Sequence, residues 1–132
     1  MTAIAVVVGL IGPLGLAYSG LAVRLGAHPW WAQSSAWIGA VAGLVIALGL
    51  LRFQLNRIAI VAIGAAVVSA GAWAAHAGKT AFANSYAEDA LAGRFWYWGW
   101  ICGLAGLTLV LVTLLWPARG LSSLPVGNVD HA

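Results

Sequence analysis

Four long uncharged stretches alternate with short polar segments along the 132-residue chain. Each stretch is close to the roughly 20 helical residues that cross the hydrocarbon core of a bilayer. Backbone amides and carbonyls in lipid must be paired within the protein, which favours helices for segments of this length. We therefore predict an all-α integral membrane protein with four transmembrane helices, over residues 4–23, 32–51, 58–77 and 95–116.

Positive charges mark the ends of these stretches, and no Asp, Glu, Lys or Arg lies within any of them. The basic residues at the boundaries are Arg24, Arg52, Arg57, Lys79, Arg94 and Arg119. Pro13 falls inside the first stretch, where a neighbouring helix or a local kink can satisfy the carbonyl that a proline leaves unpaired. Pro117 ends the fourth stretch.

The domain organisation follows from these boundaries. Residues 1–117 are expected to form a four-helix transmembrane domain, and residues 118–132, which contain Gly, Ser and Pro, a flexible C-terminal tail. The first stretch begins without the basic residues of a cleavable signal peptide, so we expect it to be retained as a span. The protein is thus predicted to be a multi-pass protein of the cell inner membrane.

The distribution of basic residues between the two sides is nearly even. Both termini are expected in the cytoplasm, because Arg52 and Arg57 concentrate positive charge at two span ends on that side. On the opposite side, Glu88 and Asp89 offset the basic residues.

An internal repeat is suggested by two similar segments. Residues 37–51 and 100–114 both begin with Trp-Ile and carry Ala-Gly-Leu five residues later. Such a repeat predicts a duplicated helix hairpin, whose halves would be related by an axis along the membrane normal.

Glycines stand at regular spacing in three of the predicted spans. Small residues let helix backbones approach closely in lipid, where van der Waals packing drives much of helix association. The predicted helix-packing positions are Gly39, Gly43, Gly64, Gly71, Gly99 and Gly103. The spacing leaves open whether the partner helix belongs to this chain, to a second copy or to another subunit.

Seven of the eight tryptophans fall near one predicted membrane surface, and only Trp116 lies near the other. An ordinary aromatic belt populates both interfaces. The run at 95–100 faces every direction of its helix, so some of its rings must point inward or toward a partner. We therefore predict that this side of the protein is functional.

The longest predicted loop, residues 78–94, lies on the same side. Ser85 and Glu88 have capping-box spacing, and Gly93 could end the short helix that they would begin. This pattern predicts a helix lying in the membrane interface, as an anchor or as a lid over the tryptophans.

A candidate binding site combines Trp73, His76, Trp96 and Trp100, which the third and fourth spans can bring to one depth. A quinone, a haem or a lipid could bind there. Two histidines on this side could in principle ligate haem iron, but His28 is next to a proline in a loop, so no resident cofactor is expected. Interfacial hydrogen bonding is the favoured role of both imidazoles.

Several kinds of chemistry have no support in the sequence. The chain has no Ser-His-Asp set, metal-ligand cluster or phosphate-binding loop, and its single cysteine, Cys102, lies in a hydrophobic stretch. An ion-coupled transporter normally carries charges within its spans. Six dispersed basic residues make no nucleic-acid surface. We therefore expect no enzymatic activity.

Three classes of function remain compatible with the sequence. The favoured one is an accessory or structural subunit of a larger membrane complex, which would dock on other subunits or on itself through its glycine faces and aromatic surface. The second is a small homo-oligomeric channel or carrier for a neutral or hydrophobic solute. The third is a membrane module that binds a quinone, haem or lipid.

Overall fold

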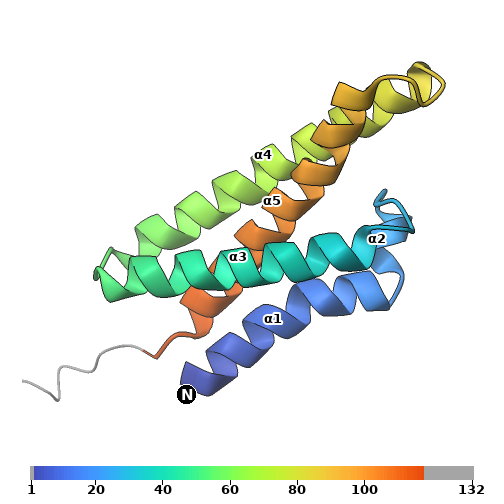
Figure 1. Cartoon of the computed structure of the whole chain (residues 1–132). Helices are drawn as coiled ribbons and strands as arrows, with labels where there is room; N and C mark the ends of the chain where they lie inside the picture. The colour runs from blue at the N-terminus through green and yellow to red at the C-terminus, as the bar shows by residue number, and fades with distance from the viewer. Residues whose placement is uncertain (1, 118–132) are drawn as a thin grey trace, which may run out of the picture.

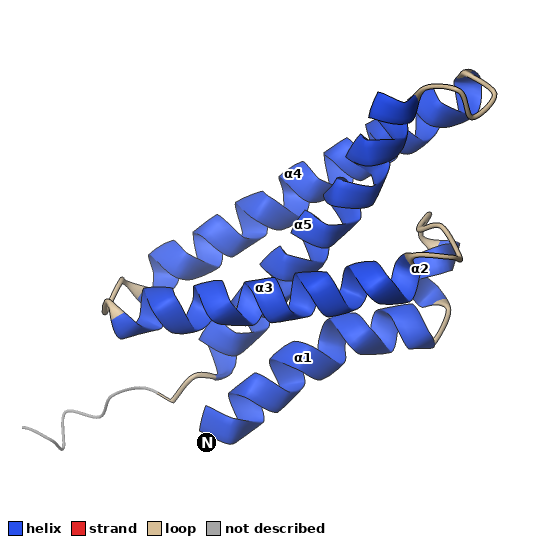
Figure 2. Ribbon diagram, in the orientation of Figure 1, coloured by secondary structure: helices blue, strands red, loops and turns tan. Residues whose placement is uncertain are grey.

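The computed structural model describes residues 2–117, and these residues are helical without any strand (Figures 1 and 2). The predicted tail, residues 118–132, lies outside the described residues. The five helices are α1 (Thr2–Tyr18), α2 (Leu21–Arg24), α3 (Ala32–Arg52), α4 (Arg57–Asn84) and α5 (Ala90–Leu115).

Three of these helices, α3, α4 and α5, are long and apolar enough to cross a membrane. The first predicted span is interrupted, because α1 is only 17 residues long and ends at Tyr18. Gly20 follows with a φ of 81°, a left-handed conformation that glycine adopts without steric cost, and the four-residue α2 begins after it. The prediction of a continuous helix over 4–23 was therefore wrong.

The distribution of side chains is that of a protein embedded in lipid. Most of the buried hydrophobic residues are alanines, whereas many large aliphatic side chains face outward, for example Val45 at 64% and Ile58 at 78% exposure. In water, so much exposed apolar surface would promote aggregation. In a bilayer it faces a solvent as apolar as itself, while small residues let the helices pack closely. Together with the three long helices, this distribution indicates a membrane protein.

Helix α5 lies at the centre of the structure and packs against α1, α3 and α4. By contrast, α3 and α4 make little contact with each other although they are consecutive in the chain (Figure 1). Helices α3 and α5, which carry the two similar sequence segments, run in the same direction. That shared direction is compatible with a duplicated hairpin, which stays a prediction.

The contact between α4 and α5 is made by glycines spaced seven residues apart on both helices. Gly71 is covered by the α5 backbone, since a Cβ built on it would lie 2.6 Å from the Gly103 amide nitrogen and 2.8 Å from the Gly99 carbonyl oxygen. Gly64 and Gly106 meet in the same way, seven residues further along each helix. The two antiparallel backbones can touch because neither presents a side chain there.

A second glycine contact joins α3 to α5. A Cβ on Gly39 would lie 2.8 Å from the Ile101 carbonyl oxygen, and one on Gly43 would meet the backbone of Ala105. The chain's own helices therefore cover five of the six predicted helix-packing glycines. Gly103 is the exception, because no described atom lies within 4 Å of a Cβ built on it, apart from its own helix backbone and chain neighbours.

The contact between α1 and α5 includes a hydrogen bond that compensates for a proline. Pro13 is buried and lacks the N–H that would bond the Gly9 carbonyl one turn earlier. The Thr108 hydroxyl of α5 donates to that carbonyl oxygen at 3.0 Å. A neighbouring helix thus satisfies the Gly9 carbonyl, which is one of the two alternatives that the sequence left open.

The predicted interfacial helix within residues 78–94 is not present, because α4 continues to Asn84 and α5 begins at Ala90. Gly78 continues the glycine contact with α5, since a Cβ on it would lie 2.6 Å from the Ala92 carbonyl oxygen. Helix α4 thus packs on α5 beyond the predicted span end. The turn between the helices is closed by Asp89, whose side chain accepts a hydrogen bond from the Ala92 amide at 3.0 Å and caps α5.

Candidate functional site

A group of aromatic rings lies where the segment before α3 meets the ends of α4 and α5. Trp96 is at its centre, with ring centroids 5.3 Å from Trp31, 5.5 Å from His28 and 5.9 Å from Phe82. The Trp31 ring also meets Tyr97 at 5.2 Å. These separations are typical of favourable aromatic pairs. We call these five residues the aromatic cluster, and they confirm the predicted concentration of aromatic rings on one side.

A long-range hydrogen bond joins Trp96 of this cluster to the loop after α2. The Trp96 indole Nε1 donates to the Gly26 carbonyl oxygen at 2.9 Å. Gly26 has a φ of 118°, which strains any residue with a side chain, so the loop can turn its carbonyl toward α5. The bond fixes the loop against α5.

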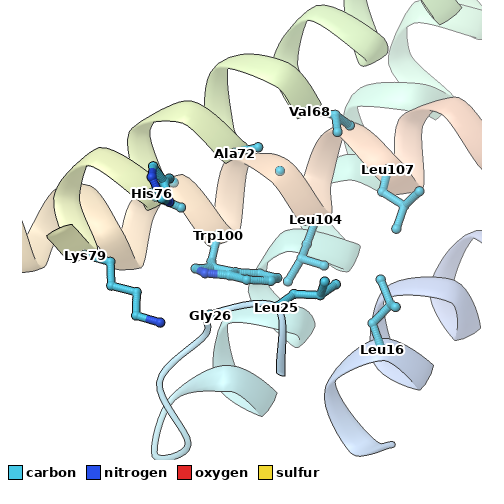
Figure 3. Close-up of a pocket in the computed structure, with 13 residues that line it drawn as sticks. Leu16, Leu25, Gly26, Val68, Ala72, His76, Lys79, Trp100, Leu104 and Leu107 are labelled. Carbon is cyan, nitrogen blue, oxygen red and sulfur yellow. The ribbon is translucent and has the colours of Figure 1, made fainter. Parts of the chain in front are cut away.

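A cavity of about 390 Å³ adjoins the aromatic cluster and is lined by α1, the loop after α2, α4 and α5 (Figure 3). Helix α4 contributes side chains at helical spacing along one face: Val68, Ala72, His76 and Lys79. Helix α5 contributes Trp100, Leu104 and Leu107. Gly103 of α5 also lines the cavity and, having no side chain, leaves space there. Leu16 of α1 and Leu25 of the loop line the opposite wall.

The cavity is polar at one end and apolar along the rest of its length. Figure 3 shows His76 and Lys79 toward one end of the cavity, with the Lys79 nitrogen near Gly26, while Leu16 and Leu107 lie at the other end. The Lys79 Nζ lies 5.9 Å from the centroid of the Trp96 ring, within reach of a cation–π interaction. The charged end therefore lies beside the aromatic cluster.

The four residues proposed from the sequence are only partly brought together. His76 and Trp100 line the cavity, and Trp96 lies beside it through its bond to Gly26. Trp73 is not among the described residues that line the cavity, and its side chain is 73% exposed. One helical step of about 100° turns it away from the face that carries the lining residues of α4.

Two functional candidates were missed in the sequence, Lys79 and the loop residue Gly26. Lys79 was assigned to a loop because the predicted span ended at residue 77. Its spacing of three residues from His76 places it on the same helical face, and this spacing could have revealed it once α4 was known to continue. Gly26 carries no pattern that marks its role.

The two histidines of the described residues, His28 and His76, lie in different parts of this region. Residues 2–117 contain no group of three or more His, Cys, Asp or Glu side chains that could hold a metal ion. His28 belongs to the aromatic cluster, where its Nδ1 accepts a hydrogen bond from the Trp30 amide at 3.2 Å. His28 is also not among the described residues that line the cavity, which leaves His76 as the imidazole there.

The cavity combines a polar end with apolar walls. One cation and one imidazole stand at the mouth of a cavity with otherwise apolar walls, which matches a ligand with a polar head and an apolar body. No protein-family model, curated protein or solved structure matches the chain. The functional proposal for this chain therefore rests on its fold and on this site.

Proposed function

We propose that this protein binds an amphipathic, lipid-like molecule in the cavity between α1, α4 and α5. The observation that carries the proposal is the polarity of the cavity, which has His76 and Lys79 at one end and aliphatic side chains along the rest. Its volume of about 390 Å³ falls within the range of roughly 300–1,000 Å³ found for small-molecule sites.

The proposal includes a four-span arrangement in the cell inner membrane with both termini in the cytoplasm. Helix α1 would form most of the first span, and α2 would extend it toward the aromatic side. The proposed ligand would enter from the lipid, because the cavity lies between helices whose outer faces are apolar. No chemical step is proposed at the site.

The test is to purify the tagged protein from its own membranes in mild detergent and to identify retained small molecules by native mass spectrometry. Gly103→Leu should fill the cavity without disturbing helix packing, since a Cβ at Gly103 meets open space. Gly49→Leu is the matched control, because a Cβ on Gly49 also meets no described atom within 4 Å outside its own helix backbone and chain neighbours, and Gly49 does not line the cavity.

We expect a molecule to be retained by the wild-type protein and by Gly49→Leu, and to be lost from Gly103→Leu. An absorption spectrum of the same sample would identify a quinone or a haem. Equal retention by all three proteins would overturn the proposal, because the cavity would then not be the binding site.

A second candidate function is that of an accessory subunit, and exposed aromatic side chains at the cluster end support it. Trp30 is 90% exposed and Tyr86 is 92% exposed, so both rings are accessible to a partner. Since five of the predicted packing glycines are covered within the chain, a partner subunit would dock on these rings instead. Stoichiometric foreign subunits in the same purification, lost on replacing Trp30 with serine, would support this function.

A further inference from the structure

The charge at the mouth of the cavity narrows the class of ligand. We propose that the cavity holds an anionic phospholipid, with its phosphate at Lys79 and His76 and one acyl chain along the aliphatic wall toward Val68 and Leu107. This inference rests on the proposed function and specifies its ligand.

The positive charge of Lys79 is directed at the cavity by neutral neighbours. Its Nζ lies over the Trp96 ring, and it would be in ordinary van der Waals contact, at 3.4 Å, with a Cβ built on Gly26. An indole ring and a glycine orient the group without neutralising it. A phosphate oxygen is the partner that an ammonium group and an imidazole N–H would bond most strongly.

The depth of the charge matches the level of a lipid headgroup. Lys79 is five residues before the end of α4 at Asn84, or about 7.5 Å along the helix axis. It lies beside Trp96, and tryptophan rings concentrate where headgroups meet acyl chains. Val68 is 11 residues earlier on the same face, about 16 Å deeper. The lining therefore changes from charged to aliphatic along the direction in which a phospholipid changes from headgroup to chain.

Two other amphiphiles fit this arrangement less well. A neutral quinone would use the His76 imidazole but would leave the Lys79 charge without a counterpart. A zwitterionic phospholipid offers the same phosphate, but it adds a cationic group that Lys79 would repel. The combination of Lys79 and His76 thus favours a headgroup with net negative charge.

The test uses delipidated full-length protein in neutral detergent, titrated with phosphatidylglycerol or phosphatidylcholine carrying the same palmitoyl and oleoyl chains. Bound lipid is counted by native mass spectrometry. Lys79→Gln removes the proposed headgroup contact, Lys79→Arg retains the charge, and Arg94→Gln removes an exposed charge near the start of α5 that does not line the cavity. Gly103→Leu and Gly49→Leu report whether binding occurs in the cavity.

We expect wild-type protein to prefer phosphatidylglycerol by about tenfold, the size of one charge-assisted contact. Lys79→Gln should lose this preference, whereas Lys79→Arg and Arg94→Gln should keep it. Circular dichroism on each variant checks that it is folded. Equal affinity of the wild-type protein for both lipids, or a preference that survives Lys79→Gln, would overturn the headgroup assignment.

The Gly103→Leu variant separates that failure from a failure of the proposed function. Loss of both lipids from Gly103→Leu with equal wild-type affinities means that the cavity binds lipid but does not select the headgroup. Binding of both lipids that is insensitive to Gly103→Leu means that they bind elsewhere on the protein, which overturns the headgroup assignment together with the cavity as a ligand site.

Discussion

Replacing Thr108 with valine would remove the hydroxyl that donates to the Gly9 carbonyl across the α1–α5 contact. Pro13 cannot supply the missing donor, because it has no N–H. The change therefore leaves a buried acceptor without its partner rather than merely weakening one bond. Interhelical hydrogen bonds in membrane proteins contribute about 0.6 kcal/mol on average and up to about 1.7. Because the acceptor is orphaned, we expect a loss near the upper end, about 1–2 kcal/mol.

A second substitution makes this reasoning specific to the proline. Pro13→Ala restores a backbone N–H that can bond the Gly9 carbonyl within α1. In that background Thr108→Val should cost about 0.5 kcal/mol or less, which gives a coupling of about 1 kcal/mol between the two positions, larger than the ~0.3–0.5 kcal/mol scatter of independent sites.

Thr113→Val provides the matched control on the same helix. Thr113 is also fully buried, but its hydroxyl donates at 2.7 Å to the Leu109 carbonyl of its own helix, which the backbone already satisfies. Unfolding free energies of the five proteins would be measured by titration with sodium dodecyl sulfate and read by circular dichroism. If Thr108→Val costs no more than Thr113→Val, or costs the same in the Pro13→Ala background, the compensation is refuted.

Three further predictions follow from the helix contacts. Gly71→Ala should destabilise the fold by about 1–3 kcal/mol in the same titration, because its Cβ would meet the α5 backbone at 2.6 Å. Gly103→Ala should leave the free energy of unfolding unchanged. Equal losses for the two variants would contradict the described packing. Trp96→Phe keeps an aromatic ring but loses the bond to the loop after α2, so protease cleavage of that loop should rise several-fold with little change in helix content. With the native cysteine replaced, Gln54→Cys and Glu88→Cys should react with an impermeant maleimide from opposite sides of sealed vesicles. If both cysteines are labelled from the same side, α4 does not cross the membrane.

The sequence predicted the three long helices well and their ends less well. Hydrophobic length marks where a helix can cross lipid, and it located α3 to within a residue. It ended the third span at residue 77 and began the fourth at residue 95, whereas α4 continues to Asn84 and α5 begins at Ala90, because helix formation does not stop where hydrophobicity falls. It also failed at Gly20, where a left-handed backbone conformation interrupts a run that contains no charged residue.

The candidate site was also predictable only in part. The aromatic run at 95–100 and its concentration on one side follow from the sequence, and His76 and Trp100 do line the cavity. Trp73 was included because it lies at the same depth, but depth says nothing about the direction in which a side chain points.

By itself, the sequence of this protein determined its class, because a chain that is 63% hydrophobic and 7% charged can bury so much apolar surface only in lipid. The central place of α5, the pairing of the glycine faces and the cavity beside Trp96 were decided by the tertiary structure. The physical reason is that helices in lipid are apolar on every side, so hydrophobic periodicity no longer marks the face turned inward. Which faces meet depends on how the shapes of two helices fit, and that fit exists only once both are in place.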